Sequence, residues 1–78
     1  MTADDYTAWA NEYWQDAEAV DSRYQKLKAE KKNKKMGSIE YIKIEKRIYA
    51  LWDQKTQCIA IAKELERKAA EIRQKEGR

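Results

Sequence analysis

Apolar side chains recur at alternating intervals of three and four residues along two long stretches of this chain. A period of about 3.5 residues is typical of helices that pack lengthwise against each other, as in a coiled coil. The first series comprises Ala3, Tyr6, Ala10, Tyr13, Ala17, Val20, Tyr24 and Leu27. The second comprises Tyr41, Ile44, Ile48, Leu51, Cys58, Ala62, Leu65, Ala69 and Ile72, with Lys55 as a polar member. The pattern therefore predicts two long helices, each with one apolar seam.

The helix boundaries follow from capping residues and glycine. The 78 residues include no proline and two glycines, so little interrupts a helix. Thr2 and Asp5 form an acidic variant of the capping box, which predicts a helix start near Ala3. Gly37 suits the left-handed position that ends a helix, and Ser38 is a favourable cap for the next one. We expect one all-α domain over residues 1–78, with helices at about 3–35 and 39–76 and a hinge at 36–38.

A hinge of about three residues joins antiparallel neighbours, so the expected fold is an antiparallel two-helix hairpin. Pairing the seams about the hinge places Ala3 opposite Ile72, and large side chains tend to face small ones in the layers between. Lys55 interrupts the second seam opposite Val20. We expect its ammonium group to reach outward to Asp16 or Asp21.

Five large apolar residues lie beside the seams and are not used by them. They are Trp14, Ile42, Tyr49, Trp52 and Ile59, and we call them the aromatic face. An apolar patch of this kind on a small chain predicts an interface. The first interpretation is a homodimer in which two hairpins form a four-helix bundle, and the alternative is a different protein partner. Trp9 lies on the opposite flank, where the pairing places it near Glu66.

Charge is separated along the chain although the net charge is only +3. Residues 1–22 carry six acidic and no basic side chains, whereas residues 23–47 carry ten basic and three acidic ones. A hairpin gathers the basic residues at its hinge end, where they form either a solvated tip or a contact surface for RNA or DNA. The candidate nucleic-acid contacts are Lys28, Lys31, Lys32, Lys34, Lys35, Tyr41, Lys43, Lys46 and Arg47.

Residue types that carry catalysis are scarce. The chain has no histidine and one cysteine, so it lacks the side chains of zinc, haem or Cys-His nucleophile sites. We expect no enzymatic activity, no metal and no cofactor, and a thiol packed in the seam at Cys58. A third alternative is a small nucleotide held among Tyr13, Tyr24, Trp52 and Lys55, in a cavity that the oligomer leaves between its helices.

The expected setting is cytoplasmic, without a membrane partner. The longest apolar run, residues 58–62, is far shorter than the roughly 20 residues of a spanning helix, and the acidic start is unlike a signal peptide. The sequence therefore predicts a non-catalytic, homo-oligomeric adaptor or inhibitor, of the kind that a phage or mobile element encodes as an accessory protein. Nucleic-acid binding by the tip is the alternative function.

Overall fold

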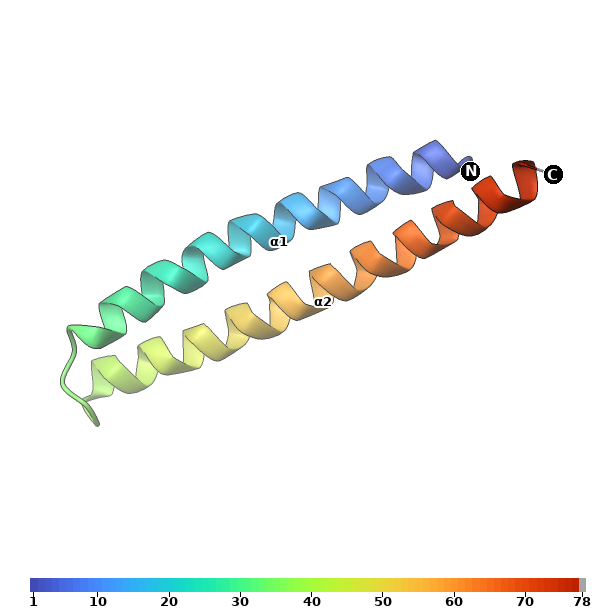
Figure 1. Cartoon of the computed structure of the whole chain (residues 1–78). Coiled ribbons are helices and arrows are strands. Elements are labelled where there is room, and N and C mark those ends of the chain that lie inside the picture. The colour runs from blue at the N-terminus through green and yellow to red at the C-terminus, as the bar shows by residue number, and fades with distance from the viewer. Residues whose placement is uncertain (78) are drawn as a thin grey trace.

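The chain folds as two long helices packed side by side in a computed structural model that describes residues 1–77. Helix α1 spans Ala3–Lys32 and helix α2 spans Ile39–Glu76, and no β-strand is present in that range. Figure 1 shows the helices running in opposite directions, with both termini at one end and the hinge at the other. The Cα atoms extend over 61 × 15 × 14 Å, so the hairpin is a thin rod. The all-α hairpin predicted from the two seams is confirmed.

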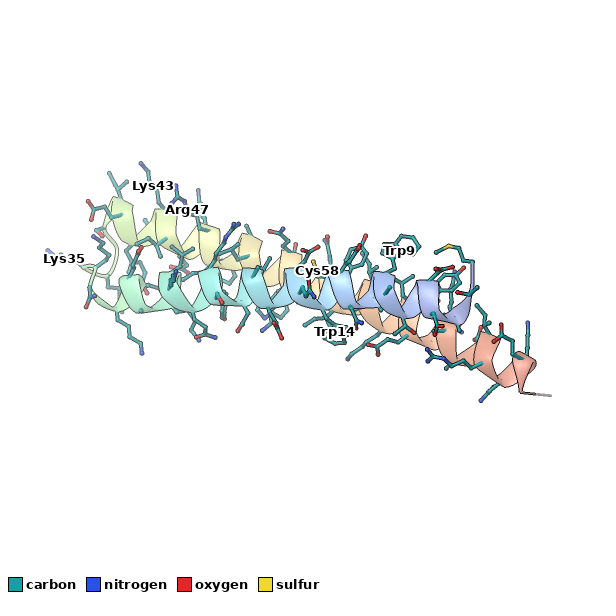
Figure 2. The ribbon with its side chains drawn as sticks, turned by 90° about the horizontal axis from the view of Figure 1, so that it is seen from above. Trp9, Trp14, Lys35, Lys43, Arg47 and Cys58 are labelled. Atoms are coloured by element: carbon teal, nitrogen blue, oxygen red, sulfur yellow. The ribbon has the colours of Figure 1, made fainter. Side chains whose placement is uncertain are left out.

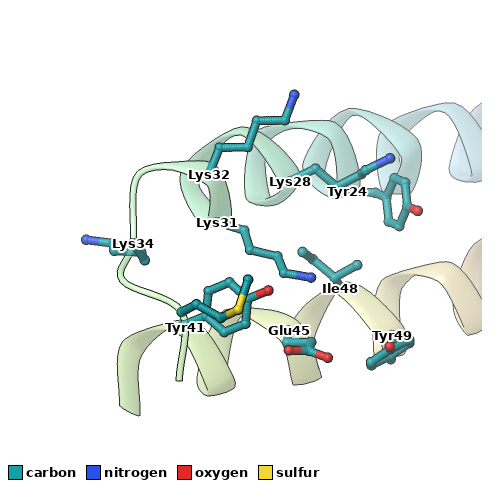
Figure 3. A pocket seen from close by; sticks show the side chains of 10 residues that line it. Tyr24, Lys28, Lys31, Lys32, Lys34, Tyr41, Glu45, Ile48 and Tyr49 are labelled. Carbon is teal, nitrogen blue, oxygen red and sulfur yellow. The ribbon is translucent and has the colours of Figure 1, made fainter. Parts of the chain in front are cut away.

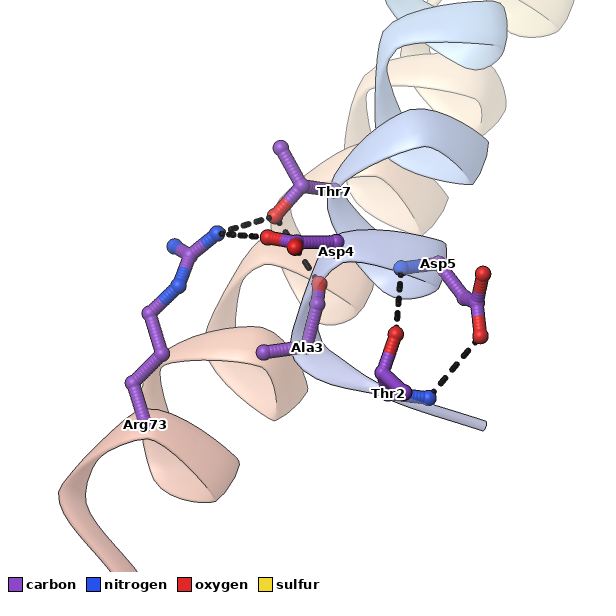
Figure 4. Close-up of polar contacts among 6 residues, drawn as sticks. All are labelled: Thr2, Ala3, Asp4, Asp5, Thr7 and Arg73. Atoms are coloured by element: carbon purple, nitrogen blue, oxygen red, sulfur yellow. Dashed lines mark hydrogen bonds and ion pairs between the residues drawn. The ribbon is translucent and has the colours of Figure 1, made fainter. Parts of the chain in front are cut away.

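The N-terminus of α1 is capped as its sequence predicts. The Thr2 N–H donates to Asp5 Oδ2 at 2.9 Å, and the Asp5 N–H donates to Thr2 Oγ1 at 3.2 Å, which completes a capping box (Figure 4). Arg73 of α2 reaches across to Thr7 Oγ1 at 3.0 Å and to Asp4 Oδ1 at 3.4 Å. These contacts hold the first turn of α1 against the last turns of α2.

Helix α1 ends three residues earlier than predicted, so the connection spans residues 33–38 instead of 36–38. The Asn33 N–H donates to the Glu30 carbonyl at 3.0 Å, and the Lys34 N–H donates to the Lys31 carbonyl at 3.2 Å, which is the tighter spacing of a closing helix turn. Another helical turn would place Lys35 one turn from Lys31, and like charges at that spacing are destabilising. Asn33 is also a poor helix former.

Gly37 has the predicted positive φ of 83°, but not the predicted place at the end of α1. It lies five residues beyond that end, in a separate turn closed by the Ser38 N–H, which donates to the Lys35 carbonyl at 3.1 Å. A positive φ at the third residue of a turn is typical of type II turns. Ser38 then caps α2, since its Oγ accepts from the Tyr41 N–H at 3.2 Å.

The core is a single line of side chains between the helices. Nine side chains of residues 1–77 are buried, all of them members of the two predicted seams: Ala3, Ala10, Ala17, Val20, Ile44, Ile48, Ala62, Leu65 and Ala69. Five of the nine are alanines, which let the helices approach closely. Ala10 and Ala62 are fully inaccessible, whereas no large side chain within the described residues is. No helix in that part of the chain has an apolar stretch long enough to cross a membrane.

We expect Ala62→Leu to lower the free energy of unfolding by about 2 kcal/mol, because a larger side chain in a fully buried site forces the helices apart. Ala60→Leu is the matched control, because Ala60 is exposed on the same helix. It should change the stability by less than about 0.5 kcal/mol. Urea unfolding followed by far-UV circular dichroism measures both, and equal effects would contradict close packing at Ala62.

Candidate binding surfaces

The aromatic face is largely open to solvent in the single hairpin. Tyr49 is 65% exposed, Trp52 53% and Ile42 45%, while Trp14 and Ile59 are half-buried. Three of the five residues therefore lie free on α2. An exposed tryptophan next to an exposed tyrosine is an arrangement that protein interfaces favour.

Trp14 is fixed by a polar contact across the hairpin, because its indole N–H donates to Glu66 Oε1. Placing Glu66 beside Trp9 was therefore wrong: Trp9 and Trp14 project from opposite sides of the rod (Figure 2). The reason is geometric, since Trp14 and Glu66 each directly follow a seam residue and such positions share a flank in an antiparallel pair. Trp9, 42% exposed, and Ile61, 41% exposed, each precede a seam residue and belong to the other flank.

Lys55 finds one of its two predicted partners. Its Nζ donates to Asp21 Oδ1 at 2.7 Å, and both side chains are about one-third exposed. This hydrogen bond lowers the pKa of Asp21 below its ordinary value of 3.8. Lys55 thus leaves the seam and ends in an ion pair at its edge, beside Trp14 and Ile59, with which it lines a pocket of about 490 Å³.

In the single hairpin, Lys55 lines a different pocket from Tyr24 and Trp52, so the nucleotide site predicted between the helices of an oligomer stays a prediction. Lys55 lines the pocket just described, which Asp21 shares. Tyr24 and Trp52 line a separate one of about 280 Å³.

A groove of about 520 Å³ opens between the helices at the hinge end, which we call the tip groove. Its lining combines three tyrosines, four lysines, two apolar side chains and one glutamate: Tyr24, Tyr41, Tyr49, Lys28, Lys31, Lys32, Lys34, Met36, Ile48 and Glu45. Figure 3 shows Lys31 extending into the space between the helices, while Lys32 and Lys34 project from its edge. Lys31 Nζ lies 5.0 Å from the centroid of the Tyr41 ring, and Lys28 Nζ lies 5.3 Å from that of Tyr24.

Five of the nine candidate nucleic-acid contacts line this groove, namely Lys28, Lys31, Lys32, Lys34 and Tyr41. Lys34 also lines a second pocket of about 270 Å³, together with Lys43 and Arg47. Lys35 and Lys46 are exposed and line neither pocket. The sequence reasoning missed Tyr24 and Tyr49 as groove residues, because it treated the first as a seam residue and the second as part of the aromatic face.

Two acidic residues of α2, Glu64 and Glu71, are engaged in ion pairs on its surface. Arg67 contacts Glu64 one turn before it and Glu71 one turn after it. The hydrogen bond from Arg67 lowers the pKa of Glu64. Among residues 1–77, no three cysteine, aspartate or glutamate side chains lie close enough together to hold a metal ion.

The Lys55–Asp21 pair predicts a pH effect with a defined sign. Because the pKa of Asp21 is lower in the folded chain, its ionised form stabilises the fold above about pH 4, and this contribution is lost as the pH falls through the folded-state pKa. In Lys55→Gln, we expect the pKa of Asp21 to rise towards 3.8 in a carboxyl NMR titration. Asp5, whose pKa is lowered by its hydrogen bonds with Thr2, is the internal control and should not change. An unchanged Asp21 would contradict the ion pair.

No protein-family model matches this chain, and no curated protein and no solved structure matches it either.

Proposed function

We propose that this chain is a non-catalytic interaction protein that pairs with a second copy of itself through the aromatic face to form an antiparallel four-helix bundle. The dimer then acts as an adaptor or inhibitor by binding another protein. A reducing, cytoplasmic setting, which keeps the single thiol of Cys58 unoxidised, belongs to the same proposal.

The observation that carries the proposal is the surface area of the single hairpin. It exposes 6179 Å², whereas a compact monomer of 9.3 kDa exposes about 5,000 Å². The excess of roughly 1,200 Å² per chain exceeds the roughly 800 Å² that each partner buries in a standard interface. A second hairpin on the aromatic face would remove a comparable area from water. It would also give Trp52 and Tyr49 the cover that the alanine seam of one hairpin does not provide.

Charge favours an antiparallel arrangement of the two hairpins. The hinge half, residues 23–56, holds eleven basic and four acidic side chains, a net charge of +7. The open half, residues 1–22 and 57–78, holds six basic and ten acidic ones, a net charge of −4. A twofold antiparallel dimer sets each hinge half beside the open half of the other copy, whereas a parallel dimer would set like charges together.

The oligomeric state tests this proposal. We expect the wild type to sediment in analytical ultracentrifugation at twice the 9.3 kDa mass of one chain. Trp52→Glu should sediment as a monomer, because it places a charge in the centre of the buried face. Trp9→Glu is the matched control and should remain dimeric, because Trp9 projects from the opposite side of the rod.

A wild type that is monomeric at micromolar concentrations would overturn the homodimer. Equal loss of dimer in both tryptophan variants would place the interface elsewhere on the hairpin. Circular dichroism of each variant establishes that the helices persist, so that loss of the dimer is separated from loss of the fold.

A further inference from the structure

The tip groove holds two kinds of chemistry that the homodimer does not require. Tyrosine rings offer flat faces on which a base can stack, and lysine ammonium groups attract phosphates. We propose that the hinge end binds single-stranded nucleic acid, with a base stacked on a tyrosine of the tip groove and the flanking phosphates held by the lysines of α1 and the connection.

The spacing of rings and cations within the groove supports this ligand. Lys31 lies 5.0 Å from the Tyr41 ring centre, and Lys28 lies 5.3 Å from that of Tyr24. A change of side-chain rotamer would therefore let the ammonium group of each lysine reach the phosphate of a nucleotide stacked on the neighbouring ring. Both lysines are flexible donors, and neither is held in an ion pair with an acidic side chain among the contacts of residues 1–77.

The charge balance of the groove selects an anion. Four lysines line it against one acidic side chain, Glu45. Met36 and Ile48 complete the lining with apolar surface that a base covers better than a phosphate does. A ligand that is both flat and anionic satisfies the whole lining, whereas a simple anion would use the lysines alone.

A strand, as opposed to a free nucleotide, is indicated by the continuation of basic residues around the hinge. Lys34 lines both the tip groove and the second pocket. The second pocket holds three basic side chains, Lys34, Lys43 and Arg47, against two acidic ones, Glu30 and Glu40. Lys34 pairs with Glu40 at 3.4 Å, at an exposed site where a phosphate can compete for the ammonium group. A chain of phosphates can pass from one pocket to the other over Lys34. A duplex does not suit this groove, because its bases are stacked inside the double helix and do not reach the tyrosines.

Homodimer formation and nucleic-acid binding use mostly different side chains at the hinge end of the hairpin. The lysine wall belongs to α1 and the connection, whereas the exposed residues of the aromatic face, Ile42, Tyr49 and Trp52, belong to α2. A second hairpin seated on α2 would therefore leave the α1 lysines at the edge of the interface. Tyr49 is shared between the two surfaces, so the stacking variant is made at Tyr41, which is not part of the aromatic face.

The experiment measures fluorescence anisotropy of a labelled oligouridylate of about 12 nucleotides titrated with the full chain. About five phosphate contacts predict a fall in affinity on the order of 100-fold between about 50 and 200 mM salt. Lys28→Gln combined with Lys32→Gln should weaken binding at least about tenfold and flatten the salt dependence. The matched control, Lys63→Gln with Lys68→Gln, removes the same charge from exposed sites at the open end and should change affinity less than about twofold.

A second variant tests stacking independently of charge. Tyr41→Leu keeps an apolar side chain in the seam and removes the ring, so it should weaken binding at least about fivefold while the salt dependence stays as in the wild type. Circular dichroism and ultracentrifugation of all variants should match the wild type. A change in oligomeric state without a change in oligonucleotide binding therefore bears on the homodimer alone.

Four outcomes would overturn the inference. They are no binding at about 50 mM salt, equal weakening by the tip and open-end variants, a duplex of the same length bound as tightly as the single strand, and uridine monophosphate bound as tightly as the oligonucleotide. The last result would identify a free nucleotide as the ligand of the tip groove.

Discussion

Close packing of two helices along an alanine-rich seam is the interaction on which the rest of this structure depends. Ala10 and Ala62 are fully buried, and the larger members of the core remain partly accessible at its edges. The register that this packing sets brings Lys55 to Asp21, Trp14 to Glu66 and Arg73 to the first turn of α1. These polar contacts are exposed or half-exposed, so each adds little to the free energy of folding and follows from the register.

The same seam explains why the hairpin has surface to spare. Two helices in contact bury one stripe each, and a thin rod cannot enclose large side chains. Tryptophan and tyrosine side chains placed beside an alanine seam therefore stay in water unless another molecule covers them. The exposed α2 residues of the aromatic face and the excess of about 1,200 Å² follow from one geometric limit. The proposed second hairpin is the simplest partner for these residues, because it brings an identical exposed aromatic face.

Reversal of the chain at the hinge also converts a linear charge pattern into a spatial one. The basic residues that end α1 and those that begin α2 meet at the hinge end of the rod, whereas the acidic start of α1 lies at the opposite end (Figure 1). Tyr24 and Tyr41 line the groove between the helices at the hinge end, next to the lysines. A tip with charge alone serves solubility, whereas a charged groove that also holds aromatic rings is a candidate ligand site.

The sequence already specifies the helices, their seams and their caps, because these depend on local spacing. Every buried residue among residues 1–77 is a predicted seam residue, and Thr2 and Ser38 cap as predicted. The predicted end of α1 was wrong, because neighbouring lysines repel each other there and a turn that contains Gly37 takes the place of the last helical turn. The folded hairpin alone shows which flank Glu66 occupies, which aspartate Lys55 contacts and which tyrosines share the tip groove. Those outcomes depend on side-chain direction across two helices, which residue spacing along one helix does not specify.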